Sequence, residues 1–153
     1  MEHSAPTILL VDDDPDDCVL VQDAWSENRL TSRLRVVNDG EQLMDYLRRR
    51  GRGGDLAGER LPALILLDLN MPKKDGREAL REIKTDPDLR GIPIVVLTTS
   101  NAEEDIARSY DLGVNSFIIK PSSFGTLVDV VGTLSRYWFG VVALPPSKDG
   151  SSV

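Results

Sequence analysis

Acidic residues follow two apolar segments of the chain, where they could act on a metal ion or a phosphoryl group. Asp12 and Asp13 come directly after residues 7–11. Asp68 comes directly after residues 63–67. Carboxylates gathered in one place repel each other, so some would take up protons unless a cation joined them. Mg²⁺ takes few protein carboxylates and keeps several waters, which suits this set, and Asp68 could be a nucleophile that forms an acyl phosphate.

Two later residues, Thr98 and Lys120, carry groups that stabilise a transferring phosphoryl group. Each lies at the end of an apolar segment, as the acids do. A lysine ammonium and a threonine hydroxyl can bind the equatorial oxygens of that group, together with a metal ion. Because side chains alternate along a strand, only one of Thr98 and Thr99 can face the acids, and the spacing to Lys120 favours Thr98.

The elements that must position these residues alternate along the chain. Five short apolar runs predict buried strands, and apolar residues at three- and four-residue spacing predict a helix after each. The strands are expected at residues 7–11, 34–37, 63–67, 92–99 and 116–120, and the helices near residues 15–28, 41–50, 77–84, 101–112 and 124–138. Since parallel crossovers are right-handed, this order predicts a doubly wound α/β fold, a five-stranded parallel sheet with five helices. Ligands of such sheets bind outside the carboxyl ends of the strands.

The run of acids after the first expected strand has two readings. Asp14 suits the N-cap of the first helix, and Asp16 and Asp17 suit its first turn, where they face the helix dipole. Helix capping is a poor explanation for Asp12 and Asp13, because they follow an apolar strand directly. These two acids therefore remain the candidates for chemistry.

Composition limits the classes of function. The chain has 153 residues, enough for one domain, and a net charge of −7, which argues against a nucleic-acid partner. Cys18 is the only cysteine, which excludes an intramolecular disulfide and a cysteine-based zinc site and fits a reducing cytoplasm. A long apolar run and a signal-peptide pattern are both lacking, so we expect a cytoplasmic protein with no membrane partner.

Taken together, these residues resemble the receiver domain of bacterial two-component response regulators. The resemblance covers roughly residues 6–137 and is carried by Asp12-Asp13, by residues 68–76 (DLNMPKKDG), by Thr98 and by Lys120-Pro121. It implies a flavodoxin-like receiver domain at residues 6–138 that is phosphorylated by a sensor histidine kinase. It also implies a protein that is not an enzyme, beyond catalysing its own aspartyl phosphorylation and dephosphorylation.

The resemblance implies a role for each acid. Asp68 would be the phosphoacceptor. The cofactor would be Mg²⁺, bound by Asp13, by Asp68 and by the backbone carbonyl of Asn70, with Asp12 acting through a water. Asp14 departs from the commonest pattern, because it adds a third acid beside the pair and so bears on metal affinity.

The resemblance also implies a conformational switch. Lys120 would contact the phosphoryl group, and its bond to Pro121 would be cis. Phosphorylation would draw Thr98 inwards and vacate space into which the ring of Phe117 turns, which changes the surface from the fourth helix to the fifth. A plain core aromatic is an equally good reading of Phe117 from the residues alone.

Ser100 has two expected roles. It lies two residues after Thr98, where family members tune the rate of dephosphorylation, so the lifetime of the phosphate is open. With Glu103 it also matches a capping box for the fourth helix, which Gly113 is expected to stop.

The apolar residues that follow the last helix leave two alternatives for the tail at residues 139–153. The tail could pack on its own domain, or it could be a dimerisation arm that reaches a second subunit; we favour the arm. The homodimer interface would then contain Tyr110, Trp138, Phe139 and Val142. The tail and residues 109–112 also resemble small stand-alone regulators that partner phytochrome-type histidine kinases.

Three other functions compete with a stand-alone, phosphorylatable receiver. An aspartyl phosphatase would need its two acids two residues apart and then a threonine, but Pro15 and Asp16 occupy that place. A phosphorylation-independent binding module would not need the full set of acids, threonine and lysine. A relay intermediate, which passes phosphate on to a histidine phosphotransfer protein, is not distinguished from a terminal regulator by these residues.

Overall fold

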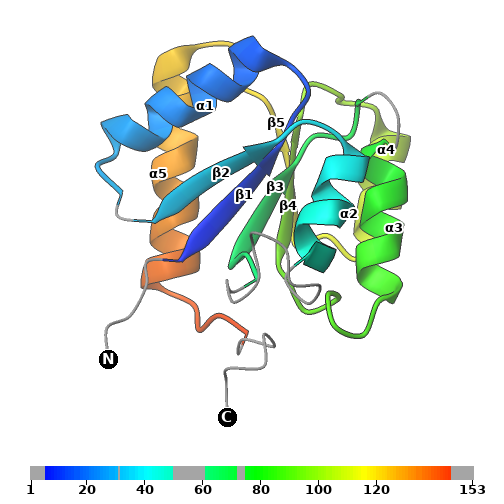
Figure 1. The fold of residues 1–153 in the computed structure, drawn as a ribbon. Coiled ribbons are helices and arrows are strands. Elements are labelled where there is room, and N and C mark those ends of the chain that lie inside the picture. The colour runs from blue at the N-terminus through cyan, green and yellow to red at the C-terminus, as the bar shows by residue number, and fades with distance from the viewer. Residues whose placement is uncertain (1–5, 31, 50–60, 72–74, 146–153) are drawn as a thin grey trace, which may run out of the picture.

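The centre of the molecule is a parallel sheet whose strands are the apolar runs of the sequence (Figure 1). The computed structural model describes residues 6–30, 32–49, 61–71 and 75–145. Within them the strands are β1 (Thr7–Val11), β2 (Arg33–Val37), β3 (Leu64–Leu67), β4 (Ile94–Thr98) and β5 (Ser116–Ile119). They pair in the order β2-β1-β3-β4-β5, and every pair is parallel. The predicted doubly wound fold is confirmed.

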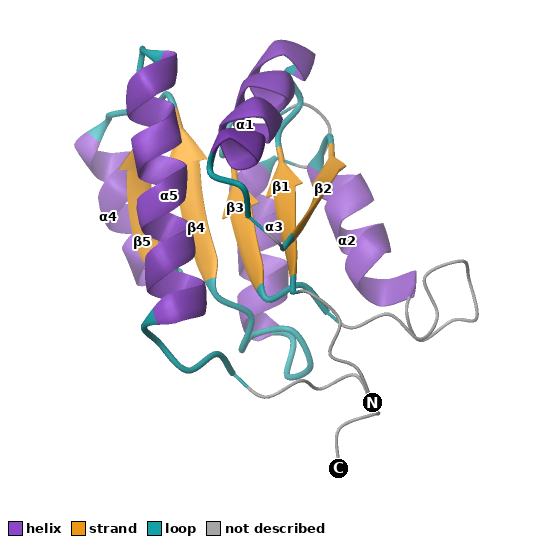
Figure 2. Ribbon diagram, turned by 90° about the vertical axis from the view of Figure 1, so that its left-hand side faces the viewer, coloured by secondary structure: helices purple, strands orange, loops and turns teal. Residues whose placement is uncertain are grey.

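Helices cover both faces of the sheet. On one face lie α1 (Pro15–Glu27) and α5 (Phe124–Gly140), and on the other lie α2 (Gly40–Arg49), α3 (Gly76–Thr85) and α4 (Glu103–Asp111) (Figures 1 and 2). The predicted stop of the second helix at Gly51 and the turn after Met71 lie outside the described residues.

Each face of the sheet has its own apolar core, because strand side chains alternate between faces. Leu9, Ile65 and Val96 belong to the core under α2 and α3. Ile8 and Leu66 belong to the core under α1 and α5. All four residues of β3 are buried, as expected for a strand covered on both faces. The strand that leads to Asp68 is therefore held rigidly at the centre of the molecule.

The observed helix ends match the predicted ones in part. Asp14 is the N-cap of α1 and accepts a hydrogen bond of 2.9 Å from the Asp16 amide, as predicted. Gly113, with a φ of +104°, ends α4 as predicted. The capping box of Ser100 and Glu103 was wrong, because α4 begins at Glu103 and no side chain caps it. The hydroxyl of Ser100 instead donates a hydrogen bond of 2.6 Å to Oδ2 of Asp105.

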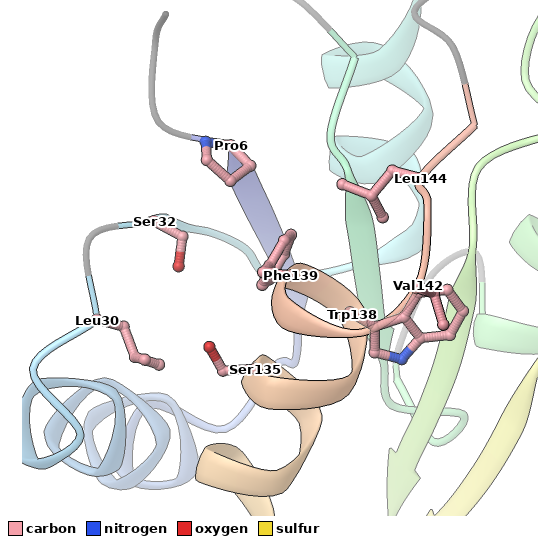
Figure 3. Close-up of a pocket in the computed structure, with 8 residues that line it drawn as sticks. All are labelled: Pro6, Leu30, Ser32, Ser135, Trp138, Phe139, Val142 and Leu144. Atoms are coloured by element: carbon pink, nitrogen blue, oxygen red, sulfur yellow. The ribbon is translucent and has the colours of Figure 1, made fainter.

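The chain after α5 turns back onto its own domain as far as it is described. Phe139, Val142 and Leu144 are half-buried against the core that contains α1 and α5. With neighbouring residues they enclose a pocket of about 380 Å³ near the amino end of β1 (Figure 3). Its lining is Pro6, Leu30, Ser32, Ser135, Trp138, Phe139, Val142 and Leu144. The part of the chain that the structure describes contains no helix long and apolar enough to cross a membrane.

Candidate functional site

The candidate site lies where the direction of strand order changes. From β1 the chain runs outwards to β2 on one side, and β3 lies on the other side. Such switch points are where open α/β sheets bind ligands. The Asp12 amide donates to the Val37 carbonyl at 3.1 Å, and the Asp68 amide donates to the Val11 carbonyl at 2.9 Å. These bonds continue the sheet by one residue and place both acids directly beyond it.

Three carboxylates meet at this point. One oxygen each of Asp12, Asp13 and Asp68 lie within 4.8 Å of one another. Asp12 is 1% and Asp68 7% exposed, whereas Asp13 is open to solvent. Oxygen ligands at this separation, with one side open for waters, are the chemistry that a hard divalent cation requires. The residues present therefore fit a divalent metal ion.

The two oxygens of Asp68 have different partners. Oδ1 accepts a hydrogen bond of 2.8 Å from the Thr98 hydroxyl and one of 3.2 Å from the Asn70 amide. Oδ2 lies 3.5 Å from Nζ of Lys120. Thr98 is fully buried and Thr99 is exposed, so Thr98 is the threonine that faces the acids. Oδ2 is left as the oxygen available for chemistry.

Lys120 joins the acids from the end of β5. Its backbone amide donates to the Thr98 carbonyl at 2.8 Å, which fixes the end of β5 beside β4. Its ammonium donates to Oδ2 of Asp12 at 2.7 Å and to Oδ2 of Asp17 at 2.8 Å. Burial alone would lower the pKa of Lys120, but the hydrogen bonds to Asp12 and Asp17 and the charge of Asp68 together raise it. The ammonium therefore stays charged at neutral pH.

Asp12 is more deeply buried than Asp13 and Asp68. Its Oδ1 accepts a hydrogen bond of 3.0 Å from the Asp14 amide, and Nδ2 of Asn38 donates to its carbonyl at 3.1 Å. Burial raises the pKa of the Asp12 carboxyl, although the hydrogen bonds from Lys120 and Asp14 act in the opposite direction. A cation at the site would favour the charged form of this carboxyl.

Sequence reasoning missed one member of the site, Asp17. It was assigned to the first turn of a helix, and in α1 it also reaches Lys120 at the far end of the chain. Its place three residues after the N-cap Asp14 was an available signal, because that is one turn into the helix that starts from the acidic pair.

The remaining predicted residues lie around this centre. Phe117 is half-buried against the core under α2 and α3. The implied cis bond between Lys120 and Pro121 was wrong, because no cis peptide bond occurs among the described residues. A trans bond before proline is favoured by about 0.5–1 kcal/mol unless packing selects cis. Ser100, beyond Thr98, lies in a network with Asp105 and Arg77, whose guanidinium is 2.9 Å from Asp105.

Known proteins are similar to this chain in sequence and in fold. The family model of the response regulator receiver domain matches residues 8–132. The chain is 43% identical over 138 residues to response regulator Rcp1 of Synechocystis sp. (strain ATCC 27184 / PCC 6803 / Kazusa). The aligned region covers 90% of this chain and 92% of that protein.

Two solved structures are also similar. The phosphorylated cyanobacterial phytochrome response regulator RcpA has a TM-score of 0.84 and 44% identity, over 93% of this chain and 99% of that chain. The Mn²⁺-bound form of Rcp1 has a TM-score of 0.81 and 42% identity, over 92% of this chain and 99% of that chain. A divalent metal ion is thus found in a relative with the same fold.

Proposed function

This chain belongs to the response regulator receiver family, and we propose that it accepts a phosphoryl group on Asp68 and signals through protein–protein contacts. The observation that carries the proposal is the surroundings of Asp68. Its carboxylate lies at the end of a central strand, beside two other acids, with the Thr98 hydroxyl at 2.8 Å and the Lys120 ammonium at 3.5 Å.

Asp68 would act through Oδ2, because Oδ1 already accepts hydrogen bonds from Thr98 and Asn70. The phosphoryl donor would be a phosphohistidine of a sensor kinase. A bond forms between Oδ2 and phosphorus, the bond from phosphorus to the imidazole nitrogen breaks, and the released imidazole takes a proton from solvent. Lys120 and Thr98 would stabilise the charge on the phosphoryl oxygens.

The metal ion of the site would be Mg²⁺. Asp13, Asp68 and the backbone carbonyl of Asn70 would hold it, with Asp12 acting through a water. Bound there, it would neutralise charge on the carboxylates and on the incoming phosphoryl group. The same residues would serve the protein's own dephosphorylation, and we propose no other catalysis.

Thr98 and Phe117 would form the switch. Thr98 already bonds to Asp68 before phosphorylation, and it pairs with Ile119 of β5. Phe117, which is half-buried, lies two residues before Ile119 on the same strand. Once Asp68 is phosphorylated, a phosphoryl oxygen would accept the hydrogen bond from Thr98. The ring of Phe117 would then turn into the space that Thr98 leaves. The surface formed by α4, β5 and α5 would then differ between the two states.

The relatives support a phytochrome-type histidine kinase as the partner, because RcpA is described as a phytochrome response regulator. We place the protein in the cytoplasm, where a lone cysteine stays reduced. A net charge of −7 disfavours nucleic acid as a partner. We propose no membrane partner.

We further propose a homodimer. Its interface would include Tyr110, which is 50% exposed, together with Trp138, Phe139 and Val142. The receiver domain would comprise residues 6–138, and the segment 139–153 would form a tail that supports the dimer. Because Trp138 is only 9% exposed in one protomer, it would act mainly by holding the neighbouring residues in place.

Intact mass spectrometry tests the phosphorylation. The wild-type protein, incubated with Mg²⁺ and acetyl phosphate, should gain one phosphoryl group, and omission of Mg²⁺ should abolish the gain. Asp68→Asn should gain none. Asp75→Asn is the matched control, because Asp75 is an N-cap of α3 outside the site, and it should react like the wild type. A phosphoryl group on Asp68→Asn would overturn the proposal.

A further inference from the structure

The ammonium of Lys120 is shared unequally among three carboxylates. Its contacts with Asp12 and Asp17 measure 2.7 and 2.8 Å, and its contact with Asp68 measures 3.5 Å. An ammonium has three donors, so these acids can use all of them. The short contacts are with Asp12, directly beyond β1, and with Asp17, in the first turn of α1, whereas the contact with Asp68 is the longest.

The three acids differ in what else they can bind. Asp12 and Asp68 belong to the group of carboxylates that fits a metal ion. Asp17 does not belong to that group, and its side chain is 32% exposed, against 1% for Asp12. With a metal ion bound, the carboxylates of Asp12 and Asp68 would interact with both the metal ion and Lys120. The carboxylate of Asp17 would interact with Lys120 without competition from the metal ion.

We propose that Asp17 is a positioning residue that holds the Lys120 ammonium at α1 and so competes with the phosphoryl group on Asp68 for it. The inference rests on the proposed function of Asp68. A phosphoryl oxygen needs at least one donor of the ammonium, and Lys120 has to loosen a contact to supply it. Asp17 thereby weakens the hold of the site on a phosphoryl group and favours its release.

Asp17 could instead act only through the dipole of α1. In that case, replacing Asp16 would have the same effect as replacing Asp17. Both acids lie in the first turn of α1. Asp16 is exposed and is not one of the three carboxylates that contact Lys120. Removing the charge of Asp16 changes the dipole interaction and the net charge but leaves Lys120 as it is. Asp16→Asn is therefore the matched control.

The affinity for beryllofluoride, a mimic of the phosphoryl group, measures the competition. Titrations followed by ¹⁹F NMR at saturating Mg²⁺ should show that Asp17→Asn binds about two- to fivefold more tightly than the wild type, the range expected from losing a partly exposed ion pair. Asp16→Asn should bind like the wild type. Asp17→Glu keeps the charge and should return the affinity to near the wild-type value.

Equal effects of Asp17→Asn and Asp16→Asn, or weaker binding by Asp17→Asn alone, would overturn the inference. Thermal unfolding of each variant establishes that it is folded. A crystal structure of Asp17→Asn tests the same step without a phosphoryl group: Nζ of Lys120 should approach Oδ2 of Asp68 to about 3 Å. An unmoved lysine would overturn the inference even if the wild type bound no beryllofluoride, and failure of the wild type to bind would count against the proposed function instead.

Discussion

The hydroxyl of Thr98 donates a 2.8 Å hydrogen bond to Oδ1 of Asp68, and the two residues are 0% and 7% exposed. A buried carboxylate that loses a donor keeps the cost of its desolvation. We expect Thr98→Val, which keeps the volume and removes the hydroxyl, to lower the free energy of unfolding by about 1–3 kcal/mol. Thr98→Ser, which keeps the hydroxyl, should cost less.

Urea unfolding at neutral pH measures both variants. The cost of Thr98→Val should shrink when Asp68 is already replaced by asparagine, because the charged acceptor is then gone. An equal cost in both backgrounds would show that packing, and not the hydrogen bond to Asp68, determines the effect.

The start of α3 lies against the backbone of Asp68. A Cβ at Gly76 would overlap the Asp68 carbonyl oxygen and would lie 2.8 Å from Cα of Leu69. Gly76→Ala should therefore destabilise the protein by about 1–3 kcal/mol and slow phosphorylation, since the backbone beside Asp68 must move. Gly125→Ala in α5 is the control, because its Cβ would meet nothing within 4 Å. A gain of stability in both alanine variants, which alanine gives in an open helix, would contradict this close approach at Gly76.

The fold could be predicted from the sequence because the apolar runs that form the strands are short and uninterrupted. The run before Asp68 became β3, and the run before Asp12 became β1. Once the strands are parallel, polar residues at their carboxyl ends must meet, which brought Asp12, Asp68 and Lys120 together. The start of β4 differs, because Pro93 has no amide to donate and the strand begins at Ile94.

Contacts between distant segments could not be predicted in the same way. The ion pair of Asp17 and Lys120 joins residues 103 positions apart, and it depends on how far α1 leans over the sheet. The predicted capping of α4 was wrong because the Ser100 side chain is held by Asp105, with which Arg77 of α3 also pairs. The sequence pattern around a helix end does not show contacts with residues that are distant along the chain.

Asp105 should contribute a pH-dependent part of the stability. Hydrogen bonds from Ser100 and Arg77 lower the pKa of its carboxyl below the ordinary value of 3.8. A lowered folded pKa stabilises the protein above the unfolded value, and this contribution is lost as pH falls below about 4. Asp105→Asn should thus cost about 0.5–1 kcal/mol at pH 7 and less at pH 3. Denaturant unfolding at several pH values measures this, and a cost independent of pH would contradict it.

Cys18 should be chemically quiet in the native protein. It is 6% exposed, and its thiol donates to the Asp12 carbonyl at 3.4 Å. Burial, together with the nearby acids, raises its pKa to about 11, so little thiolate exists at pH 8. Ellman's reagent should react slowly with the native protein and rapidly in guanidinium chloride. Since Cys18 is the only cysteine, a fast native reaction would directly contradict its buried placement.

The proposed function requires that Asp68, and no other acid of the site, accepts the phosphoryl group. Borohydride reduces an acyl phosphate to an alcohol, so a phosphorylated aspartate becomes homoserine, which peptide mass spectrometry can locate. After treatment with Mg²⁺, acetyl phosphate and borohydride, we expect homoserine at position 68 and unchanged aspartate at positions 12, 13 and 17. Homoserine at one of those other positions, with Asp68 intact, would contradict the account.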